Sequence, residues 1–204
     1  MKPRHLLLIV FAAIAMALTV VIARIPYFAG DVTLTKALQA ALPQQTAWAE
    51  WVTATAKWPW LMVLMGLSGL IAGLLAGVRA LLLAPVSLAL MWLLDKGLRM
   101  LVFQPRPSQD LIHVAVAPLP GSAFPSTFAL MFAGTFGYLV VVAIARSRGT
   151  ARLLVAAVCT GSLMIGLAAR VALGAHWPSD VLVSYLYGFV IAAGLVAFIP
   201  RRRR

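Results

Sequence analysis

The sequence predicts an all-α polytopic membrane protein with six transmembrane helices and both termini in the cytoplasm. Three observations predict it: an apolar composition, long apolar runs without charge, and an uneven distribution of basic residues. Of the 204 residues, 63% are hydrophobic and 11% are charged, and the mean hydropathy is +0.98. So little charge does not suffice to cover the surface of a soluble domain of this length. The bilayer is therefore the expected environment of the chain.

Long charge-free runs define the expected helices. A helix that crosses the hydrocarbon core needs about 20 mostly apolar residues. The six runs of this kind are 6–23, 58–78, 80–94, 123–145, 153–169 and 181–200. Runs 80–94 and 153–169 are somewhat short, so we expect their helices to extend into the charged stretches that follow. Charges at that depth are costly and are usually paired or functional. We read residues 1–204 as one domain.

Basic residues set the expected orientation. With the N-terminus inside, ten of the 17 basic residues lie on the inner side, at positions 2, 4, 79, 146, 148, 152 and 201–204. The opposite orientation would put the four terminal arginines outside, against the usual bias. The net charge of +12 is thus explained by helix flanks, and nucleic acid is not an expected partner. The predicted location is a bacterial-type cytoplasmic (inner) membrane, crossed several times.

Two features of the N-terminal part leave details to test. A basic start followed by the run 6–23 is also typical of a cleaved signal peptide. The run is long for that purpose and lacks a clear small-x-small site before Arg24, so we expect a transmembrane helix. The outer connection 24–57 carries Leu34, Leu38 and Leu42 at four-residue spacing, which predicts a short interfacial helix.

Ionisable residues from three separate stretches converge on the outer end of the predicted bundle. Arg99 ends the third helix, Arg106 follows in the next loop, and Arg170 ends the fifth helix. His176 and Asp180 precede the sixth helix. Arginine forks match phosphate oxygens, so the cluster predicts a phosphate site. Asp180 is expected to accept a hydrogen bond from one ring nitrogen of His176, which leaves the other nitrogen free to attack.

Each of these residues also has a simpler interpretation. Arg99 can form an ion pair with Asp95, one helical turn earlier. His176 can be an interfacial histidine satisfied by water. Two helix starts are also expected: Ser179 as the N-cap of the sixth helix, and the polar segment 121–127 at the start of the fourth, where free N–H groups bind anions.

Three motifs in these stretches resemble the signature of the type 2 phosphatidic acid phosphatases (PAP2), a family related to the vanadium haloperoxidases. The family pattern K-x6-RP resembles segment 99–107, with Arg in place of Lys. Segment 125–128 reads PSTF and matches the family pattern PSGH only in its first half. The pattern SR-x5-H-x3-D resembles segment 169–180, except for its leading Ser. The resemblance covers roughly residues 95–185.

The resemblance implies roles for these positions. His176 is the implied nucleophile, which forms a phosphohistidine, and Asp180 is its orienting partner. No metal or other cofactor is implied, because the arginines supply the positive charge. The implied partner is a phosphorylated lipid, bound at a site that faces the outside or periplasm. The implied phosphate-binding residues are Arg99, Arg106, Ser126, Thr127 and Arg170.

Phe128 stands where the family has its second histidine, the general acid. A positioned acid typically contributes about 10²–10⁴-fold, so three interpretations stay open. The substrate is a diphosphate, such as undecaprenyl diphosphate, whose leaving phosphate needs no proton. Alternatively, another group, for which His113 is the outer-side candidate, supplies the proton. In the third interpretation the protein binds or carries phosphorylated lipid without cleaving it.

The predicted function is therefore a metal-independent membrane lipid phosphatase that acts on a lipid phosphate or diphosphate. A catalytically impaired lipid-phosphate binder or carrier is the alternative that Phe128 favours. A phosphotransferase that passes phosphate to a second lipid, and an unrelated transporter, are further alternatives. No short motif encodes the identity of the lipid, and nothing in the sequence sets the oligomeric state.

Overall fold

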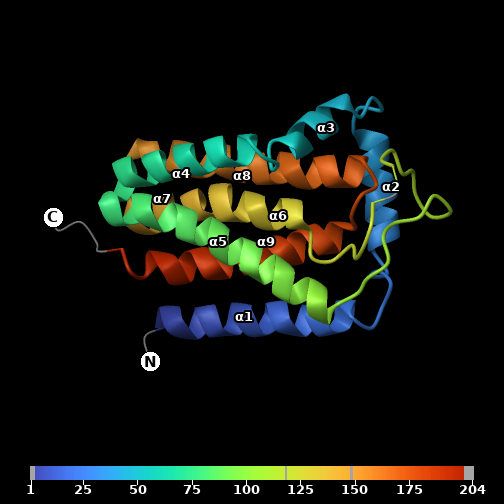
Figure 1. Ribbon diagram of the computed structural model, residues 1–204, viewed down its shortest axis with the longest axis horizontal. Helices are drawn as coiled ribbons and strands as arrows, with labels where there is room; N and C mark the ends of the chain where they lie inside the picture. The colour runs from blue at the N-terminus through green and yellow to red at the C-terminus, as the bar shows by residue number, and fades with distance from the viewer. Residues whose placement is uncertain (1–2, 118, 148, 200–204) are drawn as a thin grey trace.

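The structure is a computed structural model that describes residues 3–117, 119–147 and 149–199. In these ranges every regular element is a helix, and the longest helices lie side by side in a bundle (Figure 1). The expectation of an all-helical membrane fold is therefore confirmed.

Five helices are long and apolar enough to cross a membrane by length and composition. They are α1 (Pro3–Ile22), α5 (Val78–Leu101), the continuous helix Thr127–Arg146, α8 (Thr150–Ala172) and α9 (Pro178–Val196). A further apolar helix, α4 (Trp60–Ala76), has 17 residues, at the lower limit of about 17–25 for a spanning helix. The predicted six-span topology consists of these five helices and α4. It stays a prediction.

The two short apolar runs do extend into charged sequence, as expected. Helix α5 continues through Arg99 to Leu101, and α8 continues past Arg170 to Ala172. Within α5, Nε of Arg99 lies 3.1 Å from a carboxylate oxygen of Asp95. This pair partly neutralises the charges that the extension carries towards the membrane.

The helix Thr127–Arg146 occupies the centre of the bundle. It consists of α6 (Thr127–Phe132), the π-helical turn η1 (Ala133–Gly137) and α7 (Tyr138–Arg146). Buried residues make up 78% of its apolar window, the largest share among the five candidate spans. Gly188 of α9 allows the close approach, because a Cβ at this position would overlap the side chain of Ala133. The turn η1 is thereby packed closely against α9.

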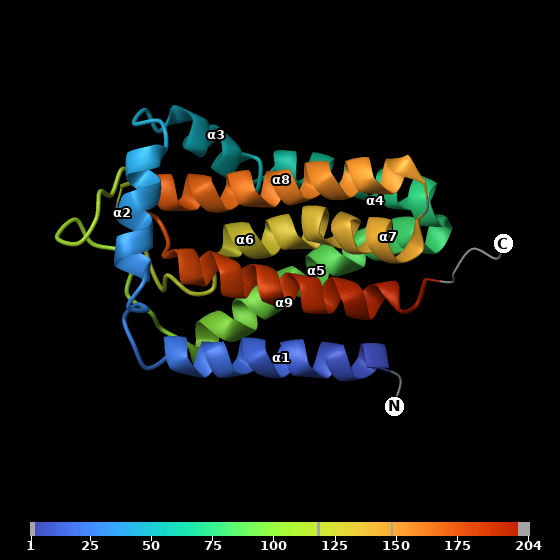
Figure 2. The same ribbon diagram turned by 180° about the vertical axis from the view of Figure 1, so that it is seen from behind.

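Two short helices close one end of the bundle. Helix α2 (Asp31–Ala41) runs across the ends of the long helices, and α3 (Ala47–Ala54) lies against α8 (Figures 1 and 2). The buried carboxylate of Asp31 accepts hydrogen bonds from the backbone N–H and the hydroxyl of Ser179, at 3.1 and 2.6 Å. The short helix expected in the outer connection is therefore present, and Leu34 on it is 46% exposed.

The start of α1 and the end of α9 lie at the opposite end of the bundle from α2 and α3 (Figures 1 and 2). The turns between α4 and α5 and between α7 and α8 lie at this end as well. Both ends of the described chain therefore lie on one side, as an even number of spans requires. That this side is cytoplasmic stays a prediction from the charge distribution.

Candidate active site

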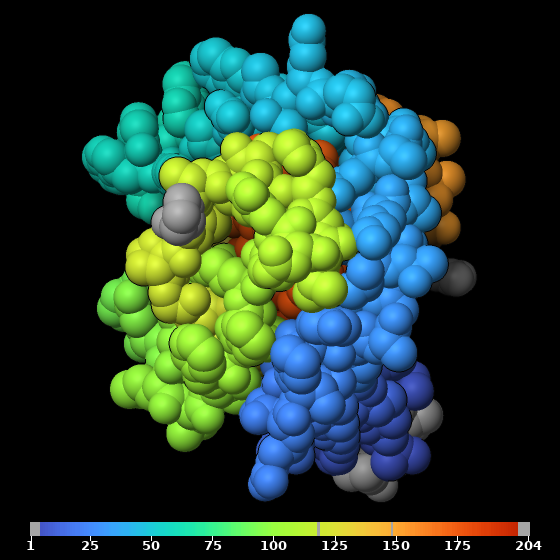
Figure 3. Space-filling model, turned by 90° about the vertical axis from the view of Figure 1, so that its right-hand side faces the viewer, coloured from blue at the N-terminus to red at the C-terminus, as the bar shows by residue number. Residues whose placement is uncertain are grey.

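A cavity of about 450 Å3 opens at the end of the bundle that carries α2 and α3. Figure 3 views this end and shows hollows between the yellow-green loop and the blue α2–α3 segment, with the orange-red chain visible below. Positive charge dominates the described lining, which also contains one carboxylate and one histidine. The ionisable lining residues are Glu50, Lys57, Arg99, Arg106, Arg170 and His176. The structure thus brings together the three arginines and the histidine that the motifs predict.

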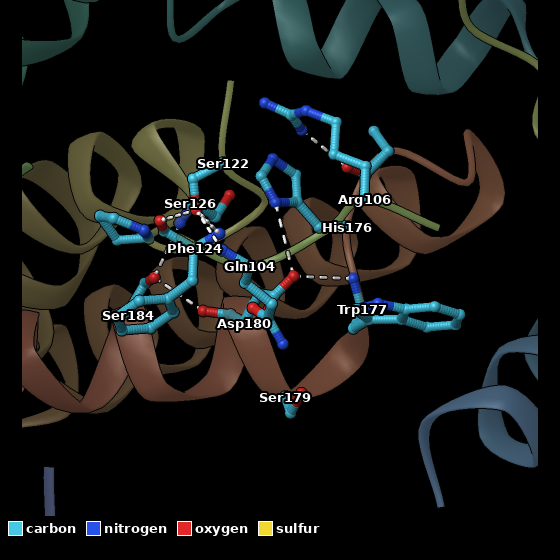
Figure 4. A network of polar contacts seen from close by, with 12 residues as sticks. Gln104, Arg106, Ser122, Phe124, Ser126, His176, Trp177, Ser179, Asp180 and Ser184 are labelled. Carbon is cyan, nitrogen blue, oxygen red and sulfur yellow. Dashed lines mark hydrogen bonds and ion pairs between the residues drawn. The ribbon is translucent and has the colours of Figure 1, made fainter. Parts of the chain in front are cut away.

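His176 lies in the turn between α8 and α9 and is 3% exposed. Its Nδ1 is 3.8 Å from Oδ2 of Asp180, which is too long for the hydrogen bond that the sequence predicts. The reason is that Oδ2 accepts a hydrogen bond from the backbone N–H of Trp177 at 3.0 Å. Figure 4 shows Asp180 on one side of the imidazole and the other ring nitrogen on the side of Arg106. Asp180 therefore faces the imidazole of His176 without a hydrogen bond to it.

The same carboxylate determines how α9 begins. The N-cap residue is Trp177, and Asp180 reaches back to its backbone N–H. The expectation that Ser179 caps this helix is therefore wrong. Ser179 lies inside the first turn, and its hydroxyl donates to Asp31 of α2. One consequence is that α2 is anchored directly beside the His176–Asp180 pair.

Burial holds His176 in its neutral form. Desolvation lowers the pKa of its imidazole well below 6.5, and the neighbouring charges of Arg170 and Arg106 lower it further. A backbone interaction with Ala123 acts in the opposite direction. A neutral imidazole has a free lone pair on one nitrogen, which is the form that can attack phosphorus.

Arg106 and Arg170 are held by one edge of the guanidinium and leave a donor unused. Arg106 donates to the carbonyl oxygens of Ala175 and Pro120, at 3.0 and 3.3 Å, and Arg170 donates to the hydroxyl of Thr53 at 3.1 Å. In the described part of the chain, Nε of each arginine is buried without a hydrogen-bond partner. Such orphaned donors are rare in proteins. Two of them beside one histidine indicate an anion-binding site.

Desolvation adds to this indication. Burial and the nearby charge of Arg99 lower the pKa of Arg106, and Asp180 acts in the opposite direction. The charged guanidinium has therefore lost water and gained a like-charged neighbour. A bound anion would compensate both costs at once, which is the usual reason for assembling arginines in one cavity.

Arg99 has a different role from the other two arginines. Its Nε contacts Asp95, and its terminal nitrogens donate to the carbonyl oxygens of Ser122 and Pro125, at 3.1 and 2.8 Å, and to the hydroxyl of Thr127 at 2.8 Å. A guanidinium has five N–H groups, so few remain for a ligand. The simpler interpretation, an Arg99–Asp95 pair, is therefore confirmed. Arg99 contributes charge to the cavity and fixes the loop before α6.

The remaining predicted positions differ in their placement. Thr127 lines the cavity, but its hydroxyl donates to Asp95 at 2.7 Å. Ser126 is completely buried; it caps α6 and its backbone N–H donates to Ser184. His113 is exposed. Neither Ser126 nor His113 is among the described residues that line the cavity.

Phe128 forms part of the cavity wall. Its ring lies 4.1 Å from that of Phe132, centroid to centroid, and the guanidinium carbon of Arg170 lies 5.5 Å from the centroid of Phe128. The position that carries a histidine in the PSGH motif is therefore filled by an apolar ring under an arginine. This contact favours the geometry of Arg170, but it supplies no proton donor.

Three lining residues come from a segment in which the sequence shows no motif. Glu50, Thr53 and Lys57 belong to α3 and the turn that follows it. Their spacing of three and four residues places them on one face of a helix, which is the signal that sequence reasoning could have used. Their position over the cavity depends on how α3 packs on α8.

The fold and this site define a class: helical membrane proteins with an arginine-lined anion cavity beside a buried histidine. The chain belongs to the PAP2 superfamily, whose family model matches residues 61–204. One similar solved structure is the crystal structure of the first transmembrane PAP2 type phosphatidylglycerolphosphate phosphatase from Bacillus subtilis. It has a TM-score of 0.70 and 18% sequence identity, over 96% of this chain and 98% of that chain. No curated protein sequence matches this chain.

Proposed function

We propose that this chain is a metal-independent membrane phosphatase that hydrolyses a lipid phosphate or diphosphate through a phosphohistidine at His176. Undecaprenyl diphosphate is one candidate substrate. The observation that carries the proposal is the combination, in one cavity, of a neutral buried histidine and two arginines with orphaned Nε donors. Members of the PAP2 superfamily are phosphatases, which supports the same reaction class.

In the proposed reaction the guanidinium groups of Arg106 and Arg170 bind the phosphoryl oxygens, and the charge of Arg99 adds to the field. The ring nitrogen of His176 that points away from Asp180 attacks phosphorus. The bond from phosphorus to the leaving oxygen breaks, and this oxygen takes the electron pair. Asp180 stabilises the positive charge that develops on the imidazole ring. Water then attacks the phosphohistidine and releases inorganic phosphate with a neutral His176.

The membrane arrangement is part of the proposal. The cavity lies at the end of the bundle opposite the start of α1 and the end of α9. With both termini in the cytoplasm of a bacterial-type cell, the cavity faces the outside or periplasm of the inner membrane. A reporter that works only in the cytoplasm should therefore be active when it is fused to either end of the chain.

A second candidate function is binding or transport of a phosphorylated lipid without cleavage. Phe128 favours it, because the ring that lines the cavity cannot protonate an alkoxide leaving group. A phosphotransferase, in which a second lipid replaces water, would use the same His176 chemistry. The arginine-lined cavity is compatible with all three functions, so a measurement of turnover decides among them.

Phosphate release from the purified protein tests the proposal. We would compare a diphosphate lipid with a monophosphate lipid, each with and without a chelator. Release that the chelator does not reduce is the expected result. Binding of both lipids without release from either would favour the carrier, and transfer of labelled phosphate to a second lipid would identify a phosphotransferase.

The pH dependence of turnover follows from the lowered pKa of His176. Because the cavity keeps this imidazole neutral below pH 6.5, kcat/KM should show no acid limb from His176 near that pH. The measurement is kcat/KM from about pH 5 to pH 8. Each value is corrected for the fraction of the substrate in each ionisation state, which phosphorus NMR gives. An acid limb that persists near pH 6.5 would contradict a neutral nucleophile. Stability is expected to respond differently from activity: the contribution of His176 to stability falls as the pH drops below about 6.5, because the unfolded chain takes up a proton there and the buried imidazole does not.

A further inference from the structure

Helix α3 forms one wall of the cavity and is held in place by contacts with α8 and Arg170. Ala49 of α3 is completely buried and packs in one cluster with Ala169 and Ala172 of α8. On the adjacent face, the hydroxyl of Thr53 accepts a hydrogen bond from Arg170. These contacts hold the segment 47–57 against the arginines, although it lies before the family-matched region 61–204.

Lys57 is a fourth cation of the cavity and differs from the other three. It lies at the end of the α3 segment and is exposed, whereas His176 is buried deep in the cavity. Among the described residues, no ion pair joins Lys57 to a carboxylate. An exposed ammonium on a flexible stem, with no ion pair to a carboxylate among the described residues, is suited to contact a second negative group of the ligand.

The charges of the lining favour an anionic phosphoryl group. Four cations and the carboxylate of Glu50 line the cavity, and Arg99 is paired with the carboxylate of Asp95, which gives 4 − 2 = +2 when His176 is neutral. A phosphate monoester carries about −1.5 to −2 at neutral pH, and the second phosphoryl group of a diphosphate adds further negative charge. The charge therefore suits a phosphoryl group, and the choice between a monophosphate and a diphosphate depends on the leaving group.

Leaving-group chemistry favours a lipid diphosphate. Phe128 occupies the wall next to Arg170, so no proton donor stands at that position. An alkoxide needs a proton to leave at a useful rate, and a general acid typically contributes about 10²–10⁴-fold. The leaving group of a lipid diphosphate is a lipid monophosphate, which is stable as an anion. A nearby cation stabilises this anion, and Lys57 is a cation that lines the same cavity.

We propose that the site is selective for lipid diphosphates and that Lys57 binds the phosphate that leaves. This inference rests on the proposed phosphatase function. The terminal phosphoryl group lies among the arginines, and the lipid-linked phosphate lies towards the rim. As the bond from His176 nitrogen to the terminal phosphorus forms, the bond from this phosphorus to the bridging oxygen breaks. The electron pair departs with the lipid monophosphate, and water then releases inorganic phosphate from His176.

The test is the ratio of kcat/KM for a lipid diphosphate to kcat/KM for the monophosphate of the same lipid. In the unaltered protein we expect a ratio of about 10² or more. Lys57→Ala should lower kcat/KM for the diphosphate about tenfold and change the monophosphate value less than about twofold. Lys57→Arg, which keeps the charge, should retain most of the preference. Lys36→Ala is the matched control, because Lys36 is an exposed lysine of α2 that is not among the described residues lining the cavity.

The outcomes separate this inference from the function on which it rests. Phosphate release with equal kcat/KM for the two lipids, or an equal loss for both in Lys57→Ala, would overturn diphosphate selectivity and leave the phosphatase intact. An unchanged diphosphate value in Lys57→Ala would overturn the role of Lys57. No release from either lipid by the unaltered protein would overturn the proposed function and this inference with it.

Discussion

Replacement of His176 by alanine is expected to abolish phosphate release, with a loss on the order of 10⁴- to 10⁶-fold in kcat, as for other covalent nucleophiles. The reason is that the imidazole supplies the attacking atom, and His176 is the one buried nucleophile among the described lining residues. The variant should still bind lipid phosphate, because the guanidinium groups of Arg106 and Arg170 still line the cavity. Turnover and lipid binding are therefore measured on the same preparation.

Two histidine variants serve as controls for this loss. His5→Ala removes a histidine near the start of α1, at the other end of the bundle, and should leave turnover unchanged. His113→Ala tests the alternative proton donor. Its side chain is exposed and is not among the described residues that line the cavity, so a change of less than about twofold is expected. A large loss in His113→Ala would place the acid there, and full activity in His176→Ala would remove the proposed mechanism.

Replacement of Phe128 by histidine is expected to raise hydrolysis of a lipid monophosphate by at least about tenfold. This is part of the about 10²–10⁴-fold that a positioned acid typically contributes. The new imidazole would stand in the cavity wall beside Arg170. Bound phosphate offsets the positive charge of that arginine and allows the imidazole to carry a proton. The lipid diphosphate should gain much less, since its leaving group already departs as an anion. The measurement is kcat/KM for both lipids.

Matched substitutions separate proton donation from altered packing. Phe128→Leu removes the ring without adding a donor and should not raise monophosphate hydrolysis. Phe132→His places an imidazole one turn further along the same helix, at a buried position that is not among the described lining residues, and should not raise it either. If Phe128→His folds, binds lipid and gains nothing, the missing acid is not what limits turnover. A gain in all three variants would point to packing instead.

The sequence predicted the larger elements because they depend on local properties. Apolar runs without charge gave five helices of spanning length, and the extension of 80–94 to Leu101 follows from the Arg99–Asp95 pair inside one helix. Motif order was also sufficient to place Arg106, Arg170 and His176 at the same end. Each of them lies next to a helix terminus, and helices that alternate in direction bring every second terminus together.

Details that depend on tertiary contacts were not predictable in the same way. The His176–Asp180 spacing allows a hydrogen bond, but Asp180 is taken by the backbone of Trp177. Ser126 belongs to a matching motif, yet it lies behind the cavity because Ser184 of α9 accepts its N–H. The α3 wall with Lys57 was missed, because its position follows from alanine packing on α8, which no local pattern encodes.

The central claim is that His176 becomes covalently phosphorylated, and trapping that intermediate tests it most directly. The protein would be mixed with the lipid that releases phosphate fastest, labelled on its terminal phosphorus, and quenched within one turnover. The account predicts label on the peptide that contains His176, stable to base and labile to acid, and none in His176→Ala. Phosphate release with no label on His176, or label on another residue, would contradict it.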